Sequence, residues 1–397
     1  MFLSSKYGIL LTAMLGYMLC NGVRQIIAST LPLIRVELQL NSYVMLGLVA
    51  AAYEIGFTSS LFPSGYLADR FNNAILSASG LLVIAFSVGF GAAATPIVFV
   101  YALTAAGIGY GIFLASSLTL VTGTFSRSRM GLGIGTYLGT GQGMGKVVYP
   151  IVATLVLAYA SWRSLYLGVA IVAGLLGFLL AIYAKKVKPV TSPQLNSLRH
   201  LLTSETASLG FANFLVINVL TLSSFIPLVL VDRYGVDVAT GALALGIFNV
   251  AGFFSSPLIG AISDRFGRGN TFVAVATGAT LSILALFFSQ SITSVMTGLC
   301  VAGFLIGSTN PLILALTWDI SAESSKGSSM GFVQAWGAFG GAFSSILLGF
   351  LMQFFGVVVV FWYCAMNSLA AALVVLAHTL TSKSFRSWVG QTKSVWA

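Results

Sequence analysis

Three ionisable side chains lie deep inside long apolar runs of this 397-residue sequence: Arg24, Glu54 and Lys146. A charge at the centre of a lipid bilayer costs about 2.5–3.5 kcal/mol even on a lenient insertion scale, so such residues face a wet cavity or one another. At the helical rise of 1.5 Å per residue they lie roughly 26, 18 and 22 Å from the starts of their runs, in the middle third of a bilayer. Two cations and one carboxylate leave one positive charge over, which a bound anion would balance.

Arg24 is the predicted anchor for that anion. A planar guanidinium binds a carboxylate through two parallel hydrogen bonds, and it is costly to bury without such a partner. Asn21 and Gln25 flank Arg24 in sequence and are predicted to contact the same ligand, unless they cap nearby backbone carbonyls instead. With Lys146 as the second cation, these residue types predict a small organic acid as the ligand.

Glu54 is the only carboxylate well inside an apolar run, which makes it the candidate proton-binding switch, with Lys146 as its exchangeable partner. Two alternatives stay open at this point. Glu54 and Lys146 could form a static ion pair with a purely structural role. Glu54 could also be the anchor of a lipophilic cation rather than of a proton.

Twelve apolar runs of roughly 20 residues carry these side chains, and each is long enough to span a bilayer as a helix. Apolar residues make up 57% of the chain, charged residues only 7%, and the mean hydropathy is +0.97. A soluble domain has about a quarter charged residues, so the sequence predicts an all-α membrane protein. The runs are 7–33, 42–64, 74–93, 97–122, 131–158, 164–184, 206–231, 239–262, 271–289, 295–318, 327–351 and 358–380.

A polar connector divides the runs six and six. It predicts an N-terminal six-helix bundle over 1–184, a cytoplasmic connector over 185–205, and a C-terminal six-helix bundle with a short tail over 206–397. The three cysteines, Cys20, Cys300 and Cys364, lie far apart inside apolar runs and have no metal-binding spacing. We expect buried free thiols, no metal and no cofactor.

The distribution of Lys and Arg predicts the orientation, because cytoplasmic loops carry the excess of positive charge. With both termini inside, the outer loops carry only Arg35, Arg163 and Arg233. This bias explains most of the formal charge of +10 without a nucleic-acid partner. The inner segments carry Lys6, Arg70, Arg127, Arg129, Lys185, Lys186, Lys188, Arg199, Arg265, Arg268, Lys326, Lys383, Arg386 and Lys393.

A charged turn occurs once in each half of the sequence. The stretch 65–71 reads GYLADRF, and the stretch 260–268 reads GAISDRFGR. A second repeat pairs glycines of the fifth and eleventh runs, where glycines four residues apart favour close helix packing. These are Gly131, Gly135, Gly141 and Gly145, with Gly327, Gly331, Gly337 and Gly341.

A membrane protein with G-x-x-x-D-R-F after the second run of each half resembles the major facilitator superfamily of transporters, which are built from repeated halves. The resemblance implies two pseudo-symmetric six-helix bundles that work by alternating access as a monomer in the plasma membrane. It also implies that the two charged turns control the conformational change. The residues concerned are Gly65, Asp69, Arg70, Gly260, Asp264, Arg265 and Arg268.

The resemblance extends to the cavity. Relatives line the cavity with their first, fourth, seventh and tenth helices and with faces of the second, fifth, eighth and eleventh. By this resemblance the candidate solute contacts of the second half are Asn218, Asn249, Asn310 and Trp336. Gln334 is a further polar candidate. The scaffold is duplicated but the charges are not, since Asn249 and Ala342 stand at the counterparts of Glu54 and Lys146. This asymmetry favours a functional role for the charges, so the expected function is proton-coupled transport of a small organic anion.

Two departures from the family pattern affect that expectation. The fifth run has Gly143-Met144 where many antiporters have Gly-Pro, and the fourth has Leu103 where many proton-coupled relatives have arginine. A drug or cation exporter that uses Glu54 stays the alternative, and a sensor that no longer moves its solute is a further one. An enzyme is disfavoured, because no H-E-x-x-H and no phosphate-binding loop is present.

Overall fold

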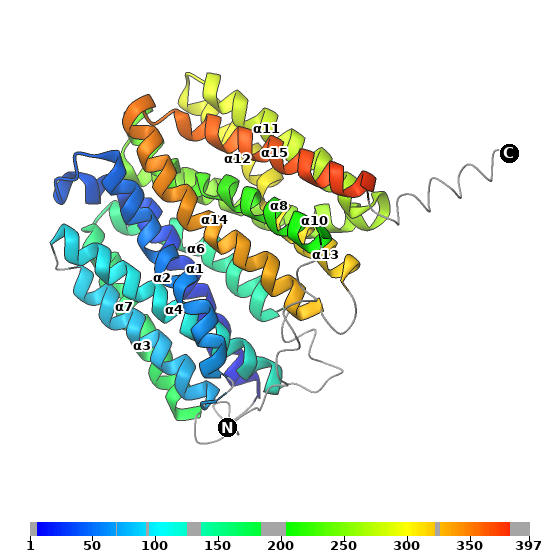
Figure 1. Ribbon diagram of the computed structural model, residues 1–397. Coiled ribbons are helices and arrows are strands. Elements are labelled where there is room, and N and C mark those ends of the chain that lie inside the picture. The colour runs from blue at the N-terminus through cyan, green and yellow to red at the C-terminus, as the bar shows by residue number, and fades with distance from the viewer. Residues whose placement is uncertain are drawn as a thin grey trace. The chain divides into compact units, whose positions relative to one another are not determined.

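The structure is a computed structural model that describes residues 6–68, 70–92, 95–124, 136–183, 204–321 and 326–381. Within these ranges every regular element is helical, which confirms the predicted all-α class (Figure 1). The elements are α1 (Lys6–Glu37), α2 (Tyr43–Ala68), α3 (Asn73–Gly91), α4 (Pro96–Thr124), η2 (Thr136–Thr140), α6 (Gly141–Leu157), α7 (Trp162–Tyr183), α8 (Ser204–Leu220), α9 (Leu222–Tyr234), α10 (Val238–Phe266), α11 (Arg268–Phe288), α12 (Ile292–Gly307), α13 (Thr309–Ile320), α14 (Lys326–Phe355) and α15 (Val359–Thr381).

Eleven of the twelve predicted spans are present, by length and composition, among the described residues. The remaining run, 131–158, starts outside them; its described part is the π-helix η2 followed directly by α6. Two spans contain a break, at Thr221 between α8 and α9 and at Ser308 between α12 and α13. The second break lies just before Pro311, because the proline ring clashes with the carbonyl of Gly307 four residues earlier.

The chain divides into two compact units that are discontinuous in sequence. Unit 1 comprises Met1–Gln194, Ser223–Gly246 and Ala342–Val358. Unit 2 comprises Leu195–Leu222, Ile247–Gly341 and Val359–Ala397. Short parts of the second half of the sequence therefore pack within unit 1.

Glycines hold the helices of each unit close together. In unit 1, a Cβ added to Gly107 of α4 would lie 2.8 Å from the Phe57 backbone nitrogen of α2. In unit 2, a Cβ added to Gly303 of α12 would lie 2.9 Å from the Phe248 Cα of α10. Gly107 and Gly303 occupy corresponding positions in the two halves of the sequence, so the close backbone contact is duplicated together with the fold.

The glycines predicted to line one helix face give a mixed result. Gly141 and Gly145 of α6 face the backbone of α1, and Gly337 of α14 faces Asn213 and Ile217 of α8, which confirms the packing role at these three positions. At Gly331 an added Cβ would meet no atom of the described residues within 4 Å, so the described residues show no packing contact there. Gly131 and Gly135 lie outside the described residues.

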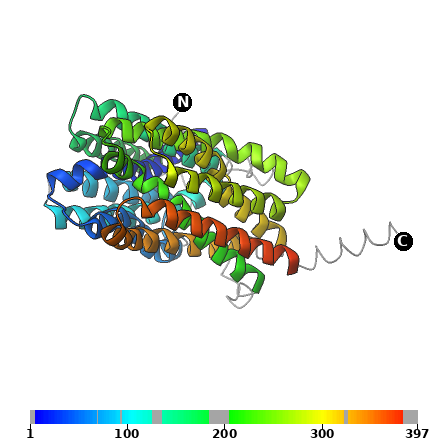
Figure 2. The same ribbon diagram turned by 90° about the horizontal axis from the view of Figure 1, so that it is seen from above.

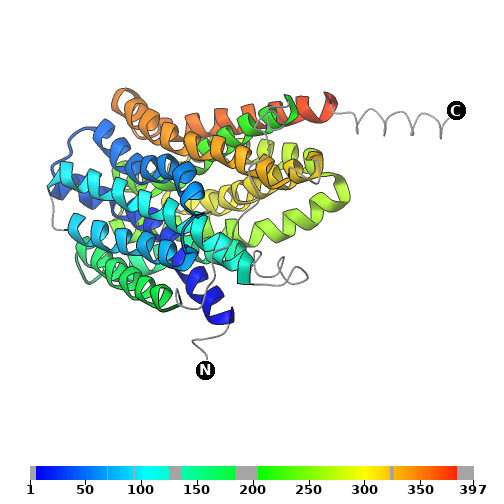
Figure 3. The ribbon, with the colours of Figure 1, turned by 60° about the horizontal axis from the view of Figure 1, so that its bottom comes forward.

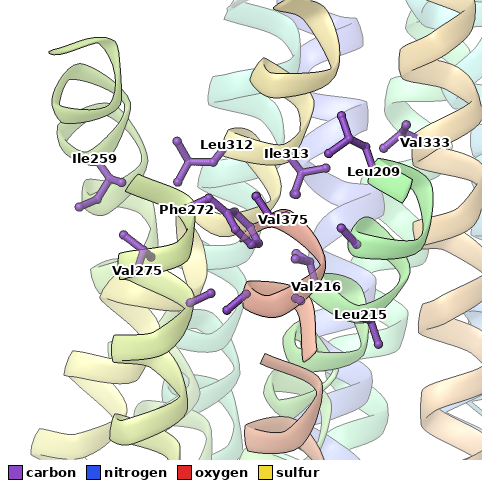
Figure 4. Close-up of a cluster of buried hydrophobic side chains, with 14 residues drawn as sticks. Leu209, Leu215, Val216, Ile259, Phe272, Val275, Leu312, Ile313, Val333 and Val375 are labelled. Atoms are coloured by element: carbon purple, nitrogen blue, oxygen red, sulfur yellow. The ribbon is translucent and has the colours of Figure 1, made fainter. Parts of the chain in front are cut away.

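Each unit packs its helices around an apolar interior. In unit 1, α3 packs against α4 and α7 (Figure 3). In unit 2, α15 lies beside α8 and α11 (Figures 1 and 2). Figure 4 shows the core of unit 2, to which α8, α10, α11, α13, α14 and α15 contribute buried side chains. Labelled there are Leu209, Leu215, Val216, Ile259, Phe272, Val275, Leu312, Ile313, Val333 and Val375.

The two copies of the charged turn start the next helix in different ways. Asn72 caps α3, its Oδ1 accepting hydrogen bonds from the backbone N–H groups of Ala74 and Ile75 at 2.9 and 3.3 Å. The counterpart position is Gly267, whose φ of +85° precedes α11. A side-chain cap in one copy and a left-handed glycine in the other give the same result, which explains why the two sequences differ here.

Candidate functional site

Arg24 of α1 and Glu54 of α2 form an ion pair. Arg24 Nη2 donates a hydrogen bond to Glu54 Oε2 at 2.8 Å. Arg24 Nε lies 2.6 Å from Glu54 Oε1, a charge contact that falls short of hydrogen-bond geometry. The two side chains are 24% and 19% exposed, so the pair is neither sealed in the core nor open to bulk solvent. Both oxygens of Glu54 therefore lie against the guanidinium of Arg24, one at Nη2 and one at Nε.

The short connection between α1 and α2 explains why these residues meet. With a rise of 1.5 Å per residue, Arg24 lies roughly 20 Å before the end of α1 at Glu37. By the same measure, Glu54 lies roughly 17 Å after the start of α2 at Tyr43. Two antiparallel helices joined by residues 38–42 thus bring the two side chains to the same depth.

Three aromatic rings surround the Arg24 guanidinium. Its Cζ lies 5.0 Å from the ring centroid of Phe57, 5.1 Å from that of Tyr110 and 5.9 Å from that of Tyr53. These distances are within the range of cation–π attraction. All three rings are buried, and they come from α2 and α4. We call Tyr53, Phe57 and Tyr110 the Arg24 aromatic cage.

Lys146 of α6 is the second cation near this pair. Its neighbour Gly145 contacts α1 at Met18 and Asn21. Among the described residues no carboxylate lies within 4.0 Å of Lys146, but it is close enough to Arg24 and Glu54 for the three charges to influence one another. The direct partner of Glu54 in this structure is Arg24, not Lys146, so the static Glu54–Lys146 pair is not observed.

The two amides predicted beside Arg24 are both buried. Asn21 is fully buried, and its Nδ2 donates a hydrogen bond to the Tyr17 carbonyl one turn earlier at 2.9 Å. It therefore satisfies a backbone carbonyl of its own helix, while its Oδ1 has no partner within the described part of the chain. Gln25 is 5% exposed and is engaged in other contacts. Their role toward a solute stays a prediction.

The predicted polar residues of unit 2 lie in two amide networks. Asn310 Nδ2 donates to Asn213 Oδ1 at 2.8 Å, and Asn213 Nδ2 donates to Gln334 Oε1 at 3.3 Å. Asn218 Nδ2 donates to Asn367 Oδ1 at 3.0 Å. The groups in both networks are neutral amides.

Two further predicted contacts of unit 2 lie outside these networks. Asn249 is buried. Trp336 is 38% exposed and lies against Gly210. Whether either of them contacts a solute stays a prediction.

The charged turns differ in their contacts. Asp69 lies outside the described residues, and the Arg70 guanidinium lies 4.1 Å from the Tyr66 ring centroid. In the second copy Arg268 lies 3.6 Å from Asp264 and 3.1 Å from Asp319.

Three other residues of the turns have little packed around them. Within the described part of the chain, an added Cβ at Gly65 or Gly260 would meet no atom within 4 Å, and Arg265 is exposed. The role of the turns in conformational change stays a prediction.

Sequence reasoning missed a polar cluster at the opposite end of α2 from the charged turn. Arg35 of α1 pairs with Asp232 of α9 at 2.5 Å, and the Tyr43 hydroxyl donates to the same Asp232 oxygen at 2.8 Å. Ser42 and the Tyr43 backbone N–H donate to Gln353 of α14 at 3.1 and 2.9 Å. No repeat or motif indicates this cluster, because its members come from both halves of the sequence.

Sequence reasoning also missed the Arg24 aromatic cage. A signal for part of it was available, because Tyr53 and Phe57 lie just before and about one turn after Glu54, on the same stretch of α2. Tyr110 carries no such signal. A tyrosine in an apolar helix is most simply interpreted as core or interface packing.

These observations define the class of protein: a multi-pass helical membrane protein with a duplicated scaffold and a partly buried group of charges on α1, α2 and α6. The family model of the Major Facilitator Superfamily matches residues 13–247 and 206–396. The chain therefore belongs to the major facilitator superfamily, whose members are secondary transporters. Its family and fold are those of transporters and not of enzymes.

Individual relatives are distant. A probable hexose phosphate transport protein of Chlamydia muridarum is 22% identical over 86% of this chain and 84% of its own length. The membrane sensor protein UhpC of Salmonella typhimurium is 25% identical over 85% and 83%. Two solved structures share the fold at lower identity. A bacterial homologue of the human lysosomal transporter Spinster, inward-facing and occupied, has a TM-score of 0.81 at 14% identity, over 96% of this chain and 98% of that one. A D-xylose–proton symporter has a TM-score of 0.75 at 17% identity, over 93% and 97%.

Proposed function

We propose that this secondary transporter moves a small organic anion by alternating access and couples that movement to protons. The observation that carries the proposal is the charge composition of the site. Arg24 and Lys146 supply two positive charges, and Glu54 supplies one negative charge that occupies the Arg24 fork. The site without a ligand thus has a net charge of +1, from +2 and −1.

We derive proton coupling from a competition between Glu54 and the solute carboxylate for the guanidinium of Arg24. A solute carboxylate needs the two N–H groups that Glu54 now engages, so Glu54 must leave first. Protonation removes the charge of Glu54 and with it most of the attraction to Arg24. A site with neutral Glu54 and one bound monoanion again has a net charge of +1, so binding one proton with each monoanion leaves the net charge of the site unchanged, and Arg24 exchanges one buried partner for another.

Lys146 acts as the second anchor. It has no carboxylate partner within 4.0 Å in the described ranges, and its flexible ammonium can meet a further oxygen of the anion. A dianion, such as a phosphate monoester, would bring the site with neutral Glu54 to zero net charge. The Chlamydia muridarum relative, a probable hexose phosphate transport protein, supports a solute of this kind.

We further propose Asn21, Gln25, Asn218, Asn249, Asn310 and Trp336 as solute contacts. The charged turns are proposed to stabilise one conformation of the transport cycle. The sequence boundaries 1–184, 185–205 and 206–397, both termini in the cytoplasm, a plasma-membrane location and a monomeric carrier complete the proposal. Single cysteines placed near each terminus and labelled from one side of the membrane would test the orientation.

The test is uptake by proteoliposomes of two probe anions, radiolabelled D-gluconate and glucose 6-phosphate, with an imposed inward proton gradient. We expect accumulation by the wild type and loss of accumulation in Arg24→Gln. Arg163→Gln is the matched control, because Arg163 pairs with Glu37 at 3.0 Å near the ends of α7 and α1, away from this site. If the wild type accumulates neither of the two probes under the gradient, the proposal is contradicted.

Two alternatives have their own signatures. For an exporter of lipophilic cations, Glu54 would be the anchor, and cation efflux would survive Arg24→Gln. Because Arg24 already contacts both oxygens of Glu54, we disfavour the exporter of lipophilic cations. A sensor is suggested by the similarity to the membrane sensor protein UhpC. A sensor would bind a probe anion, detected by a thermal shift, without moving it into proteoliposomes.

A further inference from the structure

The two partners of the Arg24–Glu54 pair are held very differently. Glu54 has no partner other than Arg24 among the hydrogen bonds and ion pairs of the described residues. The Arg24 guanidinium has Glu54 and, in addition, the three rings of the aromatic cage at 5.0, 5.1 and 5.9 Å. When the pair opens, Glu54 therefore loses its one anchor, whereas Arg24 keeps three.

The cage itself is rigid. Tyr110 stacks on Phe57 with centroids 4.3 Å apart and an interplanar angle of 17°, and on Tyr53 at 5.8 Å and 14°. The Tyr53 hydroxyl donates a hydrogen bond to the Cys20 carbonyl of α1 at 2.9 Å, which ties the cage to the helix that carries Arg24. The side chains of all three members are buried. Tyr110 is the ring that touches both other members.

We propose that Tyr110, with Phe57 and Tyr53, is a positioning residue that holds the Arg24 guanidinium in place while Glu54 departs. The anion then meets a preformed fork and no ordering of a free arginine is needed, which lowers the cost of binding. The part that concerns the anion rests on the proposed function. The part that concerns Arg24 and Glu54 does not, and it can be tested without a solute.

The first experiment measures how well Arg24 protects Glu54. Dicyclohexylcarbodiimide modifies protonated carboxyl groups in apolar surroundings, and mass spectrometry of the purified protein reports the rate at Glu54. We expect slow labelling in the wild type and fast labelling in Arg24→Gln. Tyr110→Phe keeps the ring and labels at the wild-type rate. Tyr110→Leu labels roughly five- to thirty-fold faster, the range given by the strength of a cation–π contact.

A control separates this effect from general loosening of the fold. Phe99→Leu removes a ring from another aromatic cluster of α4, where Phe99 lies 5.7 and 5.6 Å from Trp162 and Tyr166. We expect wild-type labelling in this variant. Wild-type labelling in Tyr110→Leu, or equal acceleration in Phe99→Leu and Tyr110→Leu, would overturn the inference.

The second experiment concerns the anion. With D-gluconate and glucose 6-phosphate as probes, Tyr110→Leu should raise KM about tenfold with a smaller change in maximal rate, and Tyr110→Phe should restore KM. An unchanged KM in Tyr110→Leu, with transport intact, removes the role in anion binding. If the wild type moves neither probe, the proposed function fails, and the labelling rates still decide whether Tyr110 positions Arg24.

Discussion

Arg35 Nη1 lies 2.5 Å from Asp232 Oδ2, although the two residues are 197 positions apart and belong to different halves of the sequence. The contact is reinforced by Tyr43, whose hydroxyl donates to the same oxygen. In a carrier that works by alternating access, contacts between the halves at one end must break and re-form in every cycle. The Arg35–Asp232 pair is a candidate for such a contact.

We predict that Asp232→Asn loosens the end of α1 and α2 near this pair. The ion pair is partly exposed, with side chains 30% and 18% accessible, so its loss should cost about 1 kcal/mol at most. Ser345 of α14 contacts Gly47 of α2 and is buried, which makes it a reporter. In a background with the three native cysteines replaced, maleimide labelling of Ser345→Cys should rise up to about fivefold. Equal labelling with and without Asp232→Asn would contradict this role.

Glu54→Gln should uncouple the carrier. Glutamine has nearly the shape of a protonated glutamic acid, but it cannot release a proton. We expect exchange of D-gluconate across the membrane to continue, whereas accumulation driven by a proton gradient is lost. Counterflow and gradient-driven uptake in the same proteoliposomes check this, and continued accumulation by Glu54→Gln would assign the coupling to another group.

Lys146→Gln should weaken anion binding without abolishing coupling. Hydrogen bonds to charged groups contribute about 1.5–3 kcal/mol, so KM should rise about tenfold or more. Lys146→Arg keeps the charge and serves as the matched control, with KM close to that of the wild type. If Lys146→Gln has an unchanged KM, the anion is held by Arg24 without the help of Lys146.

Gly107→Ala should destabilise the protein. The added Cβ would lie 2.8 Å from the backbone nitrogen of Phe57, which cannot move aside as a side chain would. Overpacking of this kind costs about 1–3 kcal/mol. Unfolding in detergent should show that loss, whereas Gly65→Ala, with open space around its Cβ, should stay within about 0.5 kcal/mol of the wild type.

Gly267→Ala should also destabilise, for a different reason. Gly267 has φ +85° and ψ 134°, a region that residues with a Cβ adopt at a cost of about 1–3 kcal/mol. Asn72→Ala at the counterpart position removes a helix cap and should cost about 1 kcal/mol, whereas Asn72→Gly should cost less, because glycine is a tolerated cap. Unfolding in detergent compares the three variants. A neutral Gly267→Ala would show that the turn can adopt another conformation.

Composition and repetition predict most of the fold. The apolar runs give the spans, and the recurrence of the charged turn gives the duplication. The apolar runs do not predict the pairing of Arg24 with Glu54, because α1 extends to Glu37, beyond the apolar run that ends at 33, and the starts of the runs therefore give the two residues different depths. Measured along each helix from the shared connection at 38–42, Arg24 and Glu54 lie at nearly the same depth.

The remaining features depend on rotation about helix axes and on contacts between distant segments. The sequence alone does not determine which face of α4 carries Tyr110 toward Arg24, since the apolar residues of this helix surround its whole circumference. For the same reason Asn21, which is close in sequence to Arg24, could not be recognised as buried against α6.

The glycine contacts occur in both halves, but the charges occur in one. If Arg24, Glu54 and Lys146 carry the coupling as proposed, substitutions in the second half leave their electrical balance untouched. Such a carrier could then change its choice of cargo over evolution and keep the same energy source.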